Sequence, residues 1–406
     1  MPLISAWEKQ DAVFEAAFSV IDTAIASRAF PAASIAVTHQ GLLVALKAFG
    51  APIDKTKTEG ALSTLSLGGD FDFPIIPSTL FDLASLTKVV ATTTMAMILY
   101  DRGLLELDAP VSGVVPESAA DATGNSDPRR RHVTFRMLLA HSSGLPAYEK
   151  LFLKAQSRDE LLRAAFTMPL SADPGTRAEY SDIGFIVLGT ALERVAQESL
   201  DAFCQREIFG PLAMSHATFN PIPEIRSKIP PTADERMEDE RPADKQRLKD
   251  AGLTPYTRST FRNRIIQGEV QDENAFVLGG VAPHAGLFST AEDLARFAQA
   301  MLEGGSPIVR QETVALFTRR ESSPSGTTRA LGWDTPSNPS QSGKYFRPGS
   351  YGHLGYTGTS LWIDPERQLS VTLLTNRTWT DCSNQAIKQV RPKFHDAVSE
   401  EFDKIV

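Results

Sequence analysis

Cysteine is scarce in this sequence, and its histidines are scattered. Only two cysteines occur among 406 residues, Cys204 and Cys382, and they form neither a Cys-x-x-Cys motif nor the repeated spacing of a disulfide framework. The seven histidines are dispersed along the chain, and no His-Glu-x-x-His pattern is present. The sequence therefore predicts no metal site and no disulfide-based scaffold.

Long apolar runs and an excess of positive charge are also lacking. The longest apolar stretch, residues 89–100, contains three threonines and is shorter than the roughly 20 residues that span a bilayer. Lys and Arg number 41 against 49 Asp and Glu, a net charge of −8 that repels phosphate backbones. The one basic cluster, residues 129–132, is short and is interpreted as a surface turn. We therefore expect neither nucleic acid nor a membrane as partner.

The N-terminal segment does not have the pattern of an export signal. It lacks the basic region followed by an apolar core that secretion requires, so we expect a cytoplasmic protein. Apolar residues make up 42% of the chain and charged residues 22%, which is ordinary globular usage with material for a large core. The length predicts two or three domains, or one large domain with an insertion, and leaves the oligomeric state open.

Strand-like runs occur near both ends of the chain, and helical patterns lie between them. Two predicted hairpins join residues 33–38 to 42–49 and residues 359–363 to 369–375. Helical spacing is seen over residues 7–28, 85–101 and 183–197, and Thr290 and Asp293 have the spacing of a capping box that opens a helix through Met301. This order predicts an α+β fold, with one antiparallel sheet built from both termini, flanked by helices, and a mainly helical inserted domain.

The predicted boundaries follow from this order. Residues 1–110 and 275–406 would form the α/β domain that carries the sheet, and residues 111–274 the mainly helical domain. Residues 221–270 are rich in proline and then in charge, which favours a surface excursion; a lid over a substrate cleft is the alternative.

A Ser-x-x-Lys motif, Ser85 to Lys88, stands at the start of the predicted helix 85–101. Residues three apart share a helix face, so the hydroxyl and the ammonium can meet, and the helix N-terminus stabilises negative charge near Ser85. The apolar neighbours of Lys88 predict a lowered lysine pKa, suited to a base. The alternative is a surface serine beside a solvated lysine.

Two further motifs bear on the same chemistry. Tyr180-Ser181-Asp182 precedes a helix, and a phenol beside a lysine ammonium can shuttle protons because the positive charge favours the phenolate. The alternative is a half-buried tyrosine followed by Asp182 as helix N-cap.

His353-Leu354-Gly355 leads into the last hairpin, where glycine permits close approach to the backbone. A backbone N–H there, with that of Ser85, would form an oxyanion hole; the alternative is a turn that needs glycine for its dihedral angles.

In this order the three motifs resemble the Ser-x-x-Lys, Tyr-x-Asn and Lys-Thr-Gly signature of the penicillin-recognising serine hydrolases. The tyrosine in the second motif is similar to the class C β-lactamase branch, which includes family VIII carboxylesterases, D,D-peptidases and amidases. The likeness extends over five further segments: residues 81–88, 102–111, 137–146, 286–294 and 355–359. The resemblance implies a β-lactamase/transpeptidase-like fold.

The resemblance also implies roles for individual residues. Ser85 would be the nucleophile, Lys88 its proton partner, and Tyr180 the base in acylation and the acid toward the leaving group. Backbone amides of Ser85 and Tyr356 would form the oxyanion hole, and the reaction would pass through an acyl-enzyme without a cofactor. Asp182, His353 and Gly355 would contact the small-molecule substrate.

The sequence departs from the family signature at two positions. Asp182 replaces an asparagine, offers no amide N–H and favours the charged form of Lys88. His353 replaces the third-motif lysine and is expected to be neutral at pH 7, where it attracts a substrate carboxylate poorly. We therefore expect a carboxylesterase for small or medium carboxylic esters. The alternatives are a β-lactamase or D-amino-acid peptidase or amidase, and a non-catalytic penicillin-binding-like sensor.

Overall fold

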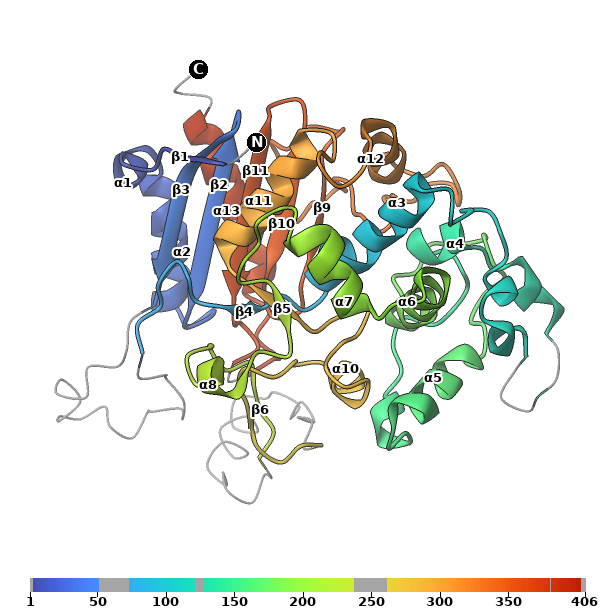
Figure 1. The fold of residues 1–406 in the computed structure, drawn as a ribbon. Coiled ribbons are helices and arrows are strands. Elements are labelled where there is room, and N and C mark those ends of the chain that lie inside the picture. Colours follow the sequence, from blue (N-terminus) through green and yellow to red (C-terminus); the bar gives the residue numbers. More distant parts are fainter. Residues whose placement is uncertain are drawn as a thin grey trace.

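The computed structural model describes residues 3–50, 73–120, 124, 127–236, 261–379 and 381–402. Its main feature is a six-stranded sheet in the order β1-β3-β2-β11-β10-β9 (Figure 1). The strands are β1 (Ile4–Ser5), β2 (Ala33–His39), β3 (Leu42–Phe49), β9 (Tyr351–Leu354), β10 (Ser360–Asp364) and β11 (Leu369–Thr375). The two chain ends meet at the centre of the sheet, where β2 pairs antiparallel with β11 over its whole length.

Both predicted hairpins are confirmed. β2 and β3 pair antiparallel across the two-residue loop Gln40-Gly41, in which both residues have positive φ (50° and 82°), the geometry of a type I′ turn that matches strand twist. β10 and β11 pair antiparallel in register from Ser360 with Leu373 to Asp364 with Leu369. The expected sheet from both termini is therefore present, with one short parallel edge pair between β1 and β3.

Helices cover both faces of the sheet. α2 (Glu15–Ala26) and α13 (Ile387–Phe402) pack together on one face, where Phe18 and Phe394 join Val37 and Val371 in one buried cluster. α11 (Ala291–Leu302) packs on the other face against β2 and β11 (Figure 1). Side chains alternate between the two faces along a strand. Ala36 of β2 accordingly belongs to the buried cluster on the α11 face, whereas the residues on either side of it belong to the cluster on the α2 and α13 face.

The N-terminal helix differs from its prediction. The pattern over 7–28 resolves into α1 (Gln10–Val13) and α2, separated by Phe14 at φ −109° and ψ 27°. The buried Phe14 ring packs against Phe402 of α13, a contact between the two ends of the chain that local periodicity does not reveal.

The middle of the chain is mainly helical. Its elements are α4 (Phe135–Leu139), α5 (Arg158–Phe166), α6 (Asp182–Ala196), α7 (Leu200–Cys204), α8 (Pro223–Arg226), α10 (Glu273–Val277) and α12 (Gln311–Thr318), with short strands β4 (Phe81–Asp82), β5 (Thr218–Phe219), β6 (Ala233–Asp234), β7 (Ile265–Ile266) and β8 (Leu287–Ser289). Residues 237–260, the centre of the Pro-rich and charged segment predicted to be a surface excursion or a lid, lie outside the described residues.

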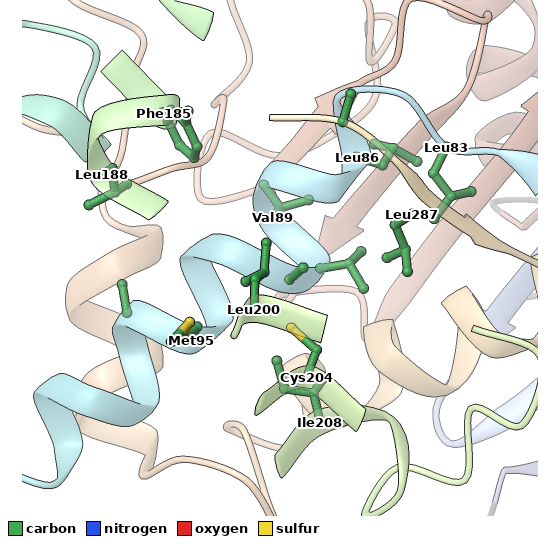
Figure 2. Close-up of a cluster of buried hydrophobic side chains, with 14 of the residues drawn as sticks. Leu83, Leu86, Val89, Met95, Phe185, Leu188, Leu200, Cys204, Ile208 and Leu287 are labelled. Atoms are coloured by element: carbon green, nitrogen blue, oxygen red, sulfur yellow. The ribbon is translucent and has the colours of Figure 1, made fainter. Parts of the chain in front are cut away.

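The helix after Ser85 runs through the main core. It begins as a π-helical segment, Lys88–Thr93, and continues as α3 (Thr94–Asp101). The Thr94 hydroxyl donates to the Val89 carbonyl five residues earlier, which accompanies the wider turn. Figure 2 shows Val89 and Met95 of this helix packed against Leu200, Cys204 and Ile208. No helix among the described residues is long and apolar enough to cross a membrane.

Candidate active site

Ser85 lies in a strained turn between β4 and the buried helix. The preceding residue, Ala84, has φ +47°, a left-handed conformation that costs free energy for a residue with a side chain. The Ala84 N–H donates to the Asp82 carboxylate at 2.8 Å, which holds the turn. Asp82 also accepts from the Gln271 N–H at 2.7 Å, and burial raises the pKa of Asp82 to about 6.

Lys88 is fully buried and makes three polar contacts at its ammonium. Its Nζ lies 3.0 Å from Ser85 Oγ, 2.9 Å from the His284 carbonyl oxygen and 2.6 Å from Asp182 Oδ1. Burial lowers the pKa of Lys88, but the negative charge of Asp182 and the neighbouring Tyr180 outweigh burial, so the pKa is raised. The expectation of a lowered lysine pKa is therefore wrong, while the expected effect of Asp182 is confirmed.

Tyr180 lies beside the Lys88 ammonium, with its ring centroid 4.9 Å from Lys88 Nζ. Its phenol interacts with the side chains of both Ser85 and Lys88. Burial raises the pKa of Tyr180; Lys88 opposes this shift and Asp182 adds to it, so the net direction is upward. The expected effect of the lysine charge, which favours the phenolate, is present, but burial of the phenol outweighs it and Asp182 adds to the upward shift of the Tyr180 pKa.

Asp182 is the first residue of α6, and Ser181 is the N-cap. Ser181 Oγ accepts from the Gly184 N–H at 2.9 Å, so the alternative interpretation of Asp182 as the helix cap is wrong. The carboxylate of Asp182 instead pairs with Lys88. Because Ser181 provides the cap, the Asp182 side chain is available to pair with the buried Lys88.

His353 lies buried on β9, in the same cavity wall as Tyr180. Its Nδ1 lies 2.8 Å from the Leu354 carbonyl oxygen, and its Nε2 has no hydrogen-bond partner among the described residues. Burial, followed by the charges of Lys88 and Arg329, lowers the pKa of His353 well below its ordinary value. The expected neutral histidine is confirmed.

Gly355 to Thr359 pack directly against the segment before Ser85. Thr357 Oγ1 donates to the Asp82 carbonyl at 2.8 Å, and Thr359 Oγ1 donates to the Leu83 carbonyl at 2.9 Å. A Cβ at Gly355 would meet the Thr359 hydroxyl and would lie 2.6 Å from the Leu83 carbonyl oxygen. Glycine is therefore required where the two segments approach, and the backbone of Tyr356 is held near Ser85.

Several polar residues at the site were not identified from the sequence. The Arg329 guanidinium lies 5.2 Å from the Tyr180 ring centroid and pairs with Asp334 at 2.8 Å. No motif or spacing marks Arg329, because it reaches the site through a long loop after α12. His141 is buried, accepts from the Ser181 N–H at 3.0 Å and packs on Tyr180, which agrees with a positioning role.

A cavity of about 850 Å³ joins these groups. The residues that line it include Ser85, Tyr180, Asp182, His353, Gly355 and Tyr356, the charged Arg329, Asp334, Arg377 and Arg391, and the aromatic or apolar Tyr148, Phe152, Leu153 and Phe261. Trp333 and Trp362 are buried and do not line this cavity, in agreement with core packing. Among the described residues no group of three His, Cys, Asp or Glu side chains is placed to hold a metal ion.

Comparison with known proteins shows the family. The model of the Beta-lactamase family matches residues 17–389. An N-acetylmuramyl-L-alanine amidase of Bacillus subtilis (strain 168) is 34% identical over 74% of this chain and 69% of its own length. A putative D-alanyl-D-alanine carboxypeptidase of Escherichia coli (strain K12) is 32% identical over 74% of this chain and 69% of its own. The chain therefore belongs to the Beta-lactamase family of serine hydrolases, as the resemblance implied.

Solved structures with the same fold are numerous. EstCE1, a hydrolase with promiscuous acyltransferase activity, superposes with a TM-score of 0.71 at 19% identity over 96% of this chain and 99% of its own. A class C β-lactamase from Rhodobacter sphaeroides superposes with a TM-score of 0.62 at 20% identity over 96% and 99%. The predicted β-lactamase/transpeptidase-like α+β fold is confirmed.

Proposed function

We propose that this serine hydrolase is a carboxylesterase that acts on small or medium carboxylic esters through an acyl-enzyme on Ser85. The observation that carries the proposal is the contact of Ser85 Oγ with a fully buried Lys88, beneath Tyr180, in the wall of the large cavity. A hydroxyl, an ammonium and a phenol in mutual contact provide a nucleophile and a proton path.

The proposed reaction has two carbonyl attacks. Ser85 Oγ adds to the ester carbonyl as its proton passes to the phenolate form of Tyr180, and the oxyanion is bound by the backbone N–H groups of Ser85 and Tyr356. Tyr180 then returns the proton to the leaving alkoxide, which departs as an alcohol and leaves the acyl group on Ser85. Water attacks this acyl-enzyme by the same path and releases the carboxylic acid.

The choice of an ester follows from the charge at the third motif. His353 is buried and neutral, so no formal charge stands where the family lysine would attract a substrate carboxylate. The apolar part of the cavity, formed by Tyr148, Phe152, Leu153 and Phe261, suits an uncharged acyl chain.

A second candidate is a D-amino-acid peptidase, amidase or β-lactamase at the same site. Arg329 favours it, because its guanidinium lies beside Tyr180 and adds positive charge near His353. A peptide that ends in a carboxylate would be attracted by such a group. The names of the amidase and the carboxypeptidase relatives support the same alternative.

The first test compares substrates and includes a nucleophile variant. We expect turnover of p-nitrophenyl acetate, butyrate and octanoate well above turnover of nitrocefin and of D-Ala-D-Ala peptides. Ser85→Ala should keep the fold and lower ester turnover by about 10³-fold or more, because the acyl-enzyme cannot form. Ser322→Ala, at an exposed serine outside the cavity, is the matched control.

Other results of this experiment would favour the alternative functions or contradict the proposed nucleophile. Nitrocefin or peptide turnover equal to ester turnover would favour the second candidate. A stable acyl adduct without product release would indicate a non-catalytic sensor. Ester hydrolysis by Ser85→Ala at the wild-type rate would contradict the proposed nucleophile.

A further inference from the structure

Two buried arginines, Arg377 and Arg391, contact the Gly355–Thr359 segment without carboxylate partners, and both also line the cavity. Arg377 and Arg391 are each 5% exposed, and no Asp or Glu among the described residues lies within ion-pair distance of either guanidinium. A buried cation is costly unless its donors are satisfied, so its partners reveal what the fold uses it for. All three acceptors of Arg391 are backbone carbonyls of this one segment, and Arg377 donates to one carbonyl of the segment and to those of Cys382 and Asn384.

Arg391, on α13, holds three of these carbonyls. Its Nη2 donates to the Gly355 oxygen at 2.6 Å and to the Thr359 oxygen at 2.9 Å, and its Nε donates to the Gly358 oxygen at 3.2 Å. The Gly358 N–H also donates to the Gly355 oxygen at 3.0 Å. The Gly355 carbonyl is therefore fixed by two donors, one of them charged.

The Gly355 carbonyl and the Tyr356 N–H belong to the same peptide group. In a trans peptide these two bonds point in opposite directions, so a donor that holds the oxygen also fixes the direction of the N–H. A charged donor on the oxygen draws electron density from the nitrogen and makes the N–H a stronger donor. Both effects act on the group proposed to bind the oxyanion.

Arg377 holds the next peptide in the chain. Its Nε donates to the Tyr356 carbonyl oxygen at 2.6 Å, and its guanidinium carbon lies 4.3 Å from the Tyr356 ring centroid. The same guanidinium donates to the Cys382 carbonyl at 2.8 Å, which anchors it. Tyr356 is thus held on both sides of its backbone by guanidinium groups.

We infer that Arg391 is a positioning residue of the oxyanion hole, which orients and polarises the Gly355–Tyr356 peptide through its bond to the Gly355 carbonyl. The inference rests on the proposed acyl-enzyme function and adds a residue to it. Arg391 also lines the cavity, and the role inferred for it is to act through this one peptide group.

The charge of Arg391 supports this role. Burial, with a contribution from Arg377, lowers the pKa of Arg391 to about 9, so two like charges are kept together in a site of low polarity. A negative charge that develops on the substrate oxygen offsets part of the unfavourable interaction between the two guanidinium charges. Preorganised positive charge of this kind stabilises the transition state more than the ground state.

The test separates transition-state binding from folding. In Arg391→Gln we expect kcat for p-nitrophenyl butyrate to fall about 10- to 100-fold, within the range for a weakened oxyanion donor. KM should stay within about twofold, and the inhibition constant of phenylboronic acid, whose tetrahedral adduct on Ser85 places an oxygen in the hole, should rise by a factor similar to the loss of kcat. Arg391→Lys keeps the charge without the planar pair of donors and should give intermediate losses.

Arg130→Gln is the matched control. Arg130 is also buried, and it also donates to three backbone carbonyls, those of Ser118, Phe166 and Met168, which do not line the cavity. This variant should lose stability but keep kcat and boronate affinity. If Arg391→Gln loses no more kcat than Arg130→Gln, or loses kcat without loss of boronate affinity, the inference is overturned.

Two further results keep the inference separate from the proposed function. If Arg391→Gln does not fold, Arg391→Lys decides by the same criterion, and unchanged kcat and boronate affinity in that variant contradict the inference. Ser85→Ala is measured in parallel. Full activity of Ser85→Ala would overturn both proposals, whereas an inactive Ser85→Ala with normal Arg391 variants would overturn the inference alone.

Discussion

At the residue scale, Asp182 contributes to the raised pKa of two neighbours. It pairs with Lys88 at 2.6 Å and raises the pKa of both Lys88 and Tyr180, and burial is the largest cause of the rise for Tyr180. Ionisation of Tyr180 would place a negative charge in a buried site beside the Asp182 carboxylate. The tyrosine therefore remains a phenol at neutral pH, and the proposed base becomes available as the pH rises.

The first residue-scale prediction concerns Asp182→Asn. Removal of the negative charge lowers the pKa of Tyr180, because the neighbouring Lys88 charge then favours the phenolate. The rising limb of kcat/KM against pH should therefore move to lower pH, as measured with p-nitrophenyl acetate between pH 6 and pH 10. Asp11→Asn, which changes an exposed carboxylate paired with Lys47, should leave the limb in place. An unmoved or upward-shifted limb in Asp182→Asn would contradict the assignment of Tyr180 as base.

Local spacing was sufficient to place Ser85 and Lys88 together, whereas the resemblance to the family implied that Tyr180 and His353 are their neighbours. Spacing did not predict the direction of the pKa shifts, because these depend on which side chains are buried beside one another. Arg329 and Arg391 carry no local signal at all. Each is far in sequence from the groups it contacts, and these groups come together only in the folded chain.

At the element scale, close approach of α6 to the 283–284 segment shapes the floor of the site. Pro283 and His284 present their carbonyls to Thr92 and Lys88 at 2.7 and 2.9 Å. Gly189, in the middle of α6, allows this approach, since a Cβ there would lie 2.5 Å from Pro283 Cγ. A helix-interior glycine, unfavourable by local propensity, is thus explained by tertiary contact.

The element-scale prediction is that Gly189→Ala destabilises the protein. In an isolated helix this change gains about 1 kcal/mol, but overpacking against Pro283 costs about 1–3 kcal/mol, and we expect the second effect to dominate. Urea denaturation should show a lower free energy of unfolding than wild type. Gly349→Ala, at a position with no heavy atom within 4 Å of the added Cβ, should show little change. A more stable Gly189→Ala would mean that α6 moves away from Pro283 at little cost.

Helix and strand positions were predictable where periodicity is local, as in α6, α11 and both hairpins. The start of α11 also follows its prediction in part: Thr290 Oγ1 accepts from the Asp293 N–H at 3.1 Å, but the Asp293 carboxylate accepts from the distant His216 N–H at 2.8 Å. The π-helical segment after Ser85 and the break at Phe14 were not predicted. Both involve contacts or hydrogen bonds that amphipathic spacing does not encode.

At the scale of the whole molecule, the sheet joins the two ends of the chain, and α13 covers one face of it beside α2. Residues Ile387, Phe394, Val398 and Phe402 of α13 are buried in the cluster that contains Phe18 and Val371. At about 1.5–3 kcal/mol for each buried side chain, these four contribute about 6–12 kcal/mol, comparable to the whole stability of a typical protein. Strand patterning predicted the joined sheet, but the order of its strands depends on pairings between distant segments.

The whole-molecule prediction concerns truncation. A chain that ends at Ala386 should lack a cooperative thermal transition and should aggregate, as followed by circular dichroism and size-exclusion chromatography. A chain that begins at Trp7, which loses only the exposed edge strand β1, should melt within a few degrees of the full-length protein. A cooperative, monomeric truncation at Ala386 would show that the sheet does not need the cover of α13.

The bond from Thr359 Oγ1 to the Leu83 carbonyl joins residues that are 276 positions apart. A ribosome adds about 5–20 residues each second, so the segment around Ser85 waits roughly 14–55 seconds before its partner is synthesised. Throughout that interval the nascent chain has a serine and a lysine at the correct spacing but no second donor for an oxyanion. Under the proposed mechanism the hydrolase thus becomes reactive only after residues 355–359 have been synthesised and have packed against the segment before Ser85, which protects the nascent chain from acylation by its own substrates until then.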